Sequence, residues 1–221
     1  MNREIKVLTD EAEGKKFKLT DGVDIAKDGT IYFTDASYKY DLQNYVHDHL
    51  ECKPHGRLLS FNPDSGITKV LLKDLYFPNG VVVSPDQNSL IFCGTRMKRC
   101  RKYWIQDDGF IDNLPGFPDN IPSDGQNMYW IGIPSVRFSY FLTLISLYRT
   151  LSMMDKYISL HHIQRNGGIL GVDLQGNPTV HLYDPALSLI TSAIQVVDHL
   201  YIGSLHDSRI SSTLLVQRVL R

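Results

Sequence analysis

Three oxygen-bearing side chains, Asp21, Asn79 and Asn120, stand near the start of similar stretches of this sequence. Carboxylate and amide oxygens are the ligands that hard cations prefer, and Ca²⁺ takes about six to eight of them. If the folded chain brings these starts together, they predict a calcium site. Asp24, three residues beyond Asp21, is a second carboxylate in the first stretch.

The same residues have a simpler interpretation. Asn, Asp and Gly are common wherever a chain turns into a strand, because they tolerate turn conformations and their side chains bond nearby backbone groups. The pairs Asn79-Gly80 and Asp119-Asn120 fit that description. The sequence therefore leaves two readings open, a cation site or ordinary turns.

The stretches are copies of one internal repeat, and the repeat decides the architecture. Each copy runs from small or acidic residues through an apolar run and a turn to a second strand. The four copies span residues 20–37, 78–95, 119–134 and 190–206. Repeats of this kind predict an all-β propeller, in which the first strand of every blade lines a central channel. The copy starts are then expected to converge on that channel.

The repeat spacing predicts about four blades and two insertions. The expected blades cover residues 17–73, 74–116, 117–186 and 187–221. The first insertion is expected to be a loop, residues 37–55. In the second, apolar residues at 138–154 recur mostly every three or four positions, which predicts one amphipathic helix at about 136–160. Such a helix packs as a lid or contacts a membrane surface.

Composition narrows the classes of partner. The chain has 221 residues and a net charge of -1, so no broad attraction to nucleic acid is expected. The basic segment 96–102 is interpreted as a solvated strand edge. The charged first 17 residues predict no signal peptide, and the longest apolar run is too short to span a bilayer. Cys93 and Cys100 form a hairpin disulfide or stay as buried thiols.

Several runs of the sequence resemble the strictosidine synthase-like family of plants, which also resembles the adipocyte plasma membrane-associated protein of animals. The runs cover residues 20–40, 54–66, 77–86, 97–105, 114–121, 183–192 and 200–206. The resemblance implies a six-bladed propeller, incomplete here, because family members normally begin with a signal or anchor segment and two further blades. It also implies an endomembrane or vacuolar location for the intact proteins.

The wider superfamily includes paraoxonases and gluconolactonases, which carry a metal in the channel. The resemblance therefore implies Ca²⁺ at Asn79, Asn120 and Asp21, with a further Glu from a blade that this chain lacks. It implies metal-assisted hydrolysis of ester or lactone bonds on a small molecule in the channel, with His206 as a candidate to activate water. The alternatives are a structural His206 and a propeller that binds small molecules without catalysis.

A third possibility is the condensation of an amine with an aldehyde, the Pictet–Spengler type of reaction. True synthases of the family carry a Glu as acid and base in the stretch that corresponds to residues 190–203. The resemblance places Ala193 at that position. Because alanine cannot transfer a proton, strictosidine synthesis by this chain is not expected.

Overall fold

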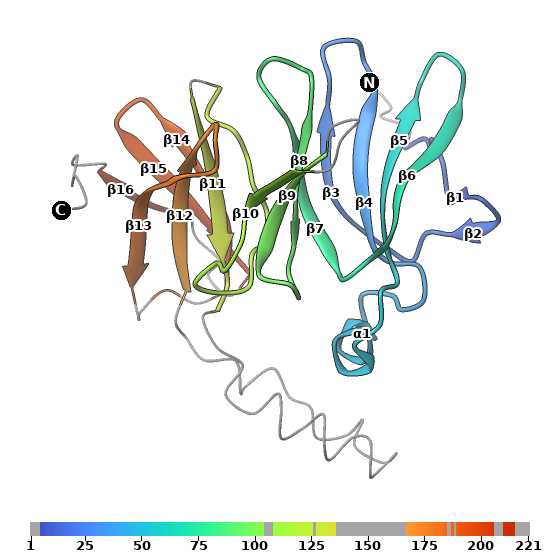
Figure 1. Cartoon of the computed structure of the whole chain (residues 1–221), viewed down its shortest axis with the longest axis horizontal. Helices are drawn as coiled ribbons and strands as arrows, with labels where there is room; N and C mark the ends of the chain where they lie inside the picture. The colour runs from blue at the N-terminus through green and yellow to red at the C-terminus, as the bar shows by residue number, and fades with distance from the viewer. Residues whose placement is uncertain are drawn as a thin grey trace.

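Small antiparallel sheets stand side by side in an arc, as Figure 1 shows. The structure is a computed structural model that describes residues 5–103, 108–125, 127–135, 167–184, 187, 189–205 and 210–214. The four sheets of three or four strands are the blades, and the chain segment that begins each blade lies on the inner side of the arc. The predicted all-β, incomplete propeller is therefore confirmed.

The first two blades each have four strands in simple up-and-down order. The strands of the first are β3 (Leu19–Ile25), β4 (Ile31–Ser37), β5 (Gly56–Asn62) and β6 (Ile67–Leu75). The strands of the second are β7 (Pro78–Val83), β8 (Leu90–Gly94), β9 (Arg99–Tyr103) and β10 (Asp108–Ile111). The Asp28-Gly29 turn closes the β3–β4 hairpin, with Gly29 at a φ of 85°.

The third and fourth sheets have three named strands each. The third contains β11 (Met128–Ile133), β12 (Gly167–Asp173) and β13 (Pro178–Asp184). The fourth contains β14 (Ile190–Val196), β15 (His199–Ser204) and β16 (Ser211–Leu214). The extended segment 119–123 is the inner edge of the third blade, because it bonds to β11 through Gly132 and Trp130.

The first insertion is not the plain loop that the sequence predicts. It contains α1 (Tyr45–Glu51), which Figure 1 shows projecting from the blade ends. A two-stranded ribbon, β1 (Glu11–Ala12) and β2 (Lys15–Lys16), packs on the outside of the first blade. Arg57 fastens this ribbon, since its guanidinium donates to the carbonyl of Ala12.

The predicted helix at 136–160, with its proposed membrane contact at 138–154, lies outside the described residues. So does His206. Within the part of the chain that the structure describes, no helix has the length and apolar character needed to cross a bilayer.

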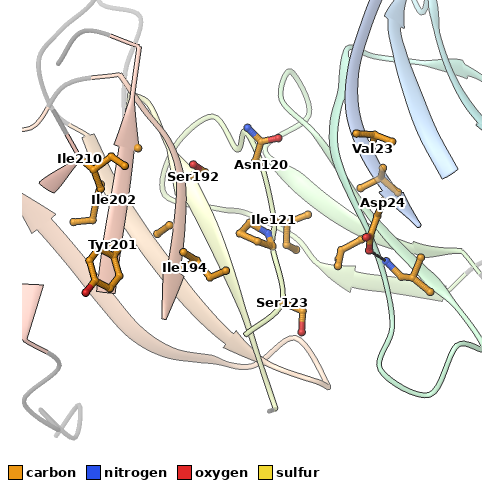
Figure 2. Close-up of a pocket in the computed structure, with 16 residues that line it drawn as sticks. Val23, Asp24, Asn120, Ile121, Ser123, Ser192, Ile194, Tyr201, Ile202 and Ile210 are labelled. Atoms are coloured by element: carbon orange, nitrogen blue, oxygen red, sulfur yellow. Dashed lines mark hydrogen bonds between the residues drawn. The ribbon is translucent and has the colours of Figure 1, made fainter. Parts of the chain in front are cut away.

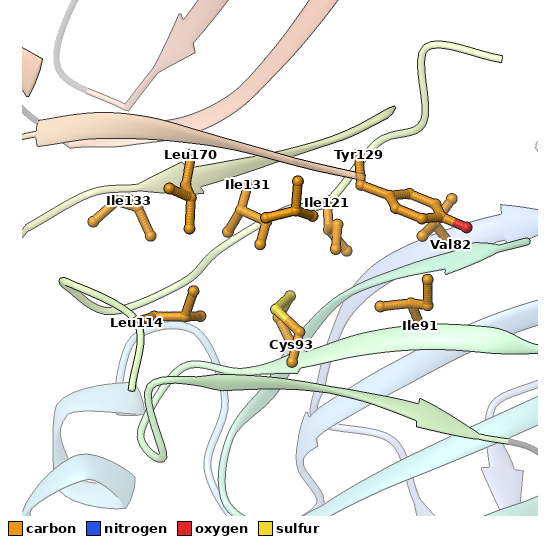
Figure 3. Packing of buried hydrophobic residues seen from close by; sticks show 11 residues of the cluster. Val82, Ile91, Cys93, Leu114, Ile121, Tyr129, Ile131, Ile133 and Leu170 are labelled. Carbon is orange, nitrogen blue, oxygen red and sulfur yellow. A yellow bond between two sulfur atoms is a disulfide. The ribbon is translucent and has the colours of Figure 1, made fainter. Parts of the chain in front are cut away.

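Neighbouring blades are joined by apolar layers. Figure 3 shows the layer between the second and third blades, in which Ile91, Ile121 and Ile131 meet with 0–2% of their surfaces exposed. Burial of such aliphatic side chains contributes about 1.5–3 kcal/mol each. These layers fix the inner strands of neighbouring blades relative to one another. The residues on the inner strands therefore keep fixed positions along the channel.

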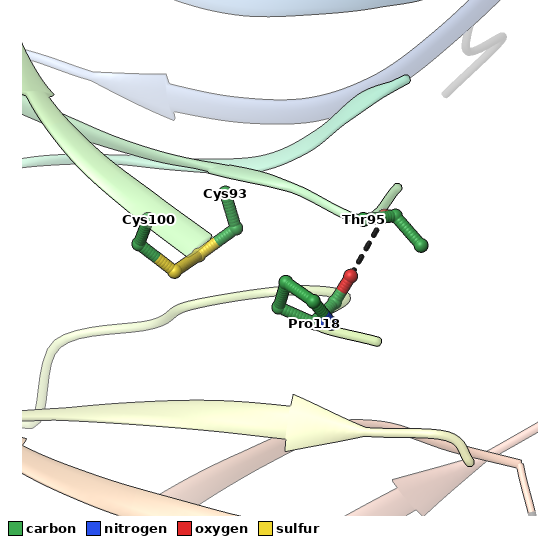
Figure 4. The surroundings of a disulfide bond; sticks show 4 residues. All are labelled: Cys93, Thr95, Cys100 and Pro118. Carbon is green, nitrogen blue, oxygen red and sulfur yellow. Dashed lines mark hydrogen bonds between the residues drawn. A yellow bond between two sulfur atoms is a disulfide. The ribbon is translucent and has the colours of Figure 1, made fainter. Parts of the chain in front are cut away.

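The outer part of the second blade differs from the sequence interpretation in one respect. The basic segment 96–102 is not a sheet edge, because β9 is paired on both sides, with β8 and with β10. Cys93 and Cys100 lie opposite each other on β8 and β9 and form a disulfide, shown in Figure 4. Of the two possibilities that the sequence leaves open for these cysteines, the structure has the hairpin disulfide.

The inner strands approach one another so closely that no side chain fits between them. A Cβ atom on Gly80 would lie 2.6 Å from Asn120 Cα and 2.7 Å from the nitrogen of Ile121. A Cβ atom on Gly22 would lie 2.5 Å from the carbonyl oxygen of Asn79. These glycines therefore set the spacing between blades at the depth of the predicted site.

Replacing Gly80 with alanine is expected to destabilise the chain by about 1–3 kcal/mol, because the clash is with backbone that cannot rotate away. Urea unfolding followed by circular dichroism measures the effect. Gly94→Ala is the matched control, since its nearest contact would be 3.7 Å. Equal stability of the two variants would contradict the close approach of these strands.

Candidate functional site

Lateral hydrogen bonds run from blade to blade across the starts of the inner strands. Thr34 Oγ1 donates to the carbonyl of Asn79 at 2.6 Å, Gly80 N donates to the carbonyl of Asp119 at 3.3 Å, and Asn120 N donates to the carbonyl of Thr191 at 3.0 Å. Each bond joins one blade to the next. The backbones of Asn79, Asp119 and Asn120 are therefore each fixed by a neighbouring blade.

The structure brings Asp21, Asn79 and Asn120 together and adds Asp119 to them. Asn120 Nδ2 donates to Asp119 Oδ1 at 3.1 Å, and the side-chain amide of Asn79 also hydrogen-bonds to the Asp119 carboxyl. The charge of Asp21 acts directly on Asp119. Asp119 is thus the centre of a cluster that the sequence analysis treated only as a turn. We call these four residues the channel cluster.

Both carboxyls of the channel cluster are poorly suited to carry charge without a partner. Burial raises the pKa of Asp119 to about 8, and the nearby charge of Asp21 raises it further, whereas the bonds from Asn79 and Asn120 lower it. Asp21 is open to the channel on one side, but the protein around it raises the pKa of its carboxyl to about 6. Two acids held close together titrate in this way unless a cation neutralises them.

Asn79 supplies the observation that favours a cation over a plain turn. Its side chain is 7% exposed, and its Oδ1 is buried without a hydrogen-bond partner. An unpartnered buried oxygen is unfavourable. Together with two carboxyls of raised pKa and the Asn120 amide, it forms an all-oxygen donor set that fits a hard cation such as Ca²⁺.

Asp24 is not part of the channel cluster. Its Oδ2 accepts from Val83 N at 2.7 Å and its Oδ1 accepts from Ile25 N at 2.9 Å. This carboxylate therefore ties the first inner strand to the second. Of Asp21 and Asp24, Asp21 is the one whose charge acts on Asp119.

Beyond the channel cluster the inner strands form an apolar wall. A cavity of about 560 Å³ is lined by aliphatic residues, including Val81, Val83, Ile121 and Ile194. Figure 2 shows Asn120 at one end of this lining and Ile121 and Ile194 farther along it. A polar site thus continues into a surface suited to the hydrocarbon part of a small molecule.

Ala193, which the sequence resemblance predicts to stand at the position of the synthase Glu, lies on β14 and is 2% exposed. Its methyl group packs with Trp130, Ile190 and Leu200 between the third and fourth blades. Nothing at this position can exchange a proton, so the structure gives no support to a condensing role.

A Ser, an Asp and a His also meet beside α1. Ser37 Oγ donates to Asp48 Oδ2 at 2.6 Å, and His55 Nδ1 lies 3.0 Å from the same oxygen. In a hydrolase triad the His stands between Ser and Asp and takes the serine proton. Here both groups bind the carboxylate, so the arrangement anchors α1 and does not activate Ser37.

The raised pKa of Asp119 predicts how stability depends on pH. The folded chain keeps a proton on Asp119 that the unfolded chain loses above the ordinary aspartate pKa of 3.8, so the stabilising contribution is lost as pH rises toward about 8. In chelator, the melting temperature is therefore expected to fall from about pH 6.5 to about pH 8.5. Calcium is expected to reduce this fall, because it stabilises the ionised cluster.

The window begins near pH 6.5 because His49 acts in the opposite direction below it. Burial, and secondarily the charge of Arg96, lowers the pKa of His49 to about 3 from its ordinary value of 6.5. Below about pH 6.5 the unfolded chain therefore binds the extra proton on His49, which offsets part of the fall that the raised pKa values of Asp119 and Asp21 produce there. Thermal melts at several pH values above 6.5 measure the fall that Asp119 causes. A chelator-state melting temperature that stays flat or rises above pH 6.5 would count against the raised pKa of Asp119.

Comparisons with known proteins find relatives that match most of the chain. A family model described as strictosidine synthase matches residues 21–108. The chain is 50% identical over 214 residues to Protein strictosidine synthase-like 7 of Arabidopsis thaliana, covering 94% of this chain and 58% of that relative. It is 29% identical over 223 residues to the adipocyte plasma membrane-associated protein of Bos taurus, covering 91% and 54%. The chain spans a little over half the length of these relatives.

Solved structures show the same fold. A gluconolactonase from Xanthomonas campestris aligns with a TM-score of 0.59 at 17% identity, over 90% of this chain and 58% of that one. Regucalcin, a calcium-binding protein from Agrobacterium tumefaciens, aligns with a TM-score of 0.53 at 13% identity, over 86% and 55%. At these identities the likeness concerns the fold alone. By its sequence matches and its propeller blades, the chain belongs to the strictosidine synthase-like family.

Proposed function

We propose that the protein to which this chain belongs is a metal-assisted hydrolase of ester or lactone bonds in small molecules. The observation that carries the proposal is the channel cluster, in which Asn79 and Asn120 bond to the Asp119 carboxyl, Asp21 lies close enough to act on its charge, and Asn79 Oδ1 is buried without a hydrogen-bond partner. A gluconolactonase and a calcium-binding regucalcin share the fold, which adds support by analogy.

The residues of the channel cluster have distinct parts in this proposal. Asp21, Asn79, Asp119 and Asn120 would hold the cation, which when bound polarises a substrate carbonyl. Asn120 Nδ2 orients the Asp119 carboxyl through its hydrogen bond to Oδ1. Because its pKa is about 8 without a cation, the Asp119 carboxyl must lose a proton to hold the cation near neutral pH, which links cation binding to pH.

The surrounding structure suits a substrate with an apolar portion. The aliphatic wall beyond Asn120 offers a surface on which that portion packs, with Ile121 and Ile194 on it. The Cys93–Cys100 disulfide fits a protein that resides in an oxidising compartment of the endomembrane system. His206 remains a candidate from the sequence for activating water.

The test is hydrolysis of phenyl acetate and of a simple lactone by the 221-residue chain, in calcium and in chelator. The proposal expects hydrolysis above the buffer rate that falls about ten-fold or more in chelator and in Asp119→Asn. Lys69→Gln, an exposed substitution on β6, is the control and should hydrolyse like the wild type. Hydrolysis that is indifferent to chelator and to Asp119→Asn would refute the metal-assisted mechanism.

A second candidate function is small-molecule binding without catalysis. The size and aliphatic lining of the channel cavity favour it, since a cavity of about 560 Å³ can bury most of a small ligand. Under this alternative, calcium promotes saturable binding of the ester or lactone, and no product forms. Equilibrium dialysis beside the hydrolysis assay separates the two functions.

A further inference from the structure

A groove at the rim between the first and second blades collects two arginine side chains. Arg99 and Arg101 line a cavity of about 100 Å³ together with Leu75, Tyr76 and Phe92. The two arginines are two positions apart on β9, so their side chains lie on the same face of the sheet. The groove therefore offers two guanidinium groups to one small space.

The charges in this groove are only partly balanced. Both arginines are half-buried, and the Arg101 guanidinium lies over the Phe92 ring at 5.9 Å from its centroid. Burial lowers the pKa of Arg101, the neighbouring charge of Arg99 lowers it further, and Asp112 opposes the effect. Among the described residues, the Arg99 side chain has neither a hydrogen bond nor an ion pair. Two like charges in a partly desolvated site favour an anion between them.

The remaining lining restricts what the anion can be. Leu75 and Phe92 are buried and apolar, with 8% and 2% of their surfaces exposed. Among the described residues that line the groove, Asp74 carries a carboxylate, and this residue is exposed to solvent. The nearby Arg96 is engaged elsewhere, because it donates to the carbonyl of His49 at the end of α1. The site is thus small, lined by two arginines and one exposed carboxylate, and closed on one side by apolar surface.

We propose that this groove binds a phosphate group, held by Arg99 and Arg101. The planar guanidinium groups match the oxygens of phosphate, and their two charges match its double charge. The groove lies where β6 ends and β7 begins, the end of the blades at which Asn79 stands. A bound phosphate therefore lies at the same end of the second blade as Asn79, either as part of a soluble phosphate ester or as the headgroup of a phospholipid.

The primary test is calorimetric titration of the 221-residue chain with inorganic phosphate at low ionic strength. We expect saturable binding that weakens as salt is added. Arg99→Gln, which removes no described contact, is expected to lower the affinity about five-fold or more, and the double variant with Arg101→Gln about ten-fold or more. Asp74→Asn removes the opposing carboxylate and is expected to tighten binding. Lys69→Gln, an exposed charge change on β6, should leave it unchanged.

A second arm identifies the source of the phosphate. Vesicles of phosphatidylcholine with and without phosphatidic acid are sedimented with the wild type and with Arg99→Gln. Retention that requires phosphatidic acid and is lost in Arg99→Gln supports a lipid headgroup, and phosphate binding without retention supports a soluble ester. The proposal is overturned if phosphate does not bind the wild type. It is also overturned if Arg99→Gln is folded like the wild type and binds phosphate with the same affinity.

Discussion

Replacing Asp119 with asparagine is expected to weaken calcium binding about ten-fold or more while making the calcium-free chain more stable at about pH 8.5. The two effects have one cause. Burial, and secondarily the charge of Asp21, raises the pKa of the Asp119 carboxyl to about 8. Ionised, it attracts a cation, but without a cation its charge is unfavourable.

Asparagine is the informative substitution because it preserves the shape of the side chain. Its oxygen can still accept the bond that Asn120 Nδ2 donates to Oδ1. Melting temperatures with calcium and with chelator, at about pH 8.5, measure both effects at once. Asp24→Asn is the control, since this carboxylate bonds backbone amides outside the channel cluster. A loss of stability in chelator for Asp119→Asn would mean that the carboxyl acts only as a structural acceptor.

Replacing Arg57 with alanine is expected to cost about 3–5 kcal/mol of folding free energy. Arg57 Nη2 lies 2.6 Å from Asp35 Oδ2, and the two side chains are 4% and 0% exposed. Removing the guanidinium leaves a buried carboxylate whose Oδ1 keeps only the backbone bond from Leu19 N at 3.3 Å. The substitution also releases the β1–β2 ribbon, because Arg57 Nη1 donates to the carbonyl of Ala12.

Urea unfolding measures this loss of folding free energy. Two further variants show whether the loss comes from the buried ion pair. Lys73→Ala removes an ion pair with Glu13 that is exposed on both sides, and is expected to cost less than about 1 kcal/mol. Combining Arg57→Met with Asp35→Leu removes both charges and is expected to recover much of the loss. If Arg57→Ala cost no more than Lys73→Ala, the Asp35–Arg57 pair would not hold the first blade together.

The sequence predicts the blades well because their signals are local. Alternation around Asp28-Gly29 and the repeated strand starts need no knowledge of distant contacts. The same logic fails for Asp119. Next to Asn120 and after Pro118 it has the composition of a turn. The folded chain brings its carboxyl to the Asn79 side chain and to the charge of Asp21, both from neighbouring blades.

Two other features depend on contacts between distant residues. The seven residues of α1 are too few for a convincing helical period, and the helix is held by Ser37, His55 and Arg96, which lie outside it. The basic segment 96–102 has the composition of a solvated edge, yet β10 pairs with β9 and covers it. In both cases tertiary contacts decide what composition leaves open.

The central claim is that the inner strands assemble a cation site around Asp119. Calorimetric titration of the chelator-treated chain with calcium at about pH 7.5, in two buffers of different ionisation enthalpy, tests it directly. Because the pKa of Asp119 is about 8, binding is expected to release up to about one proton, with a dissociation constant on the order of 10⁻⁴–10⁻³ M. Absence of binding, or binding that releases no proton, would contradict the claim.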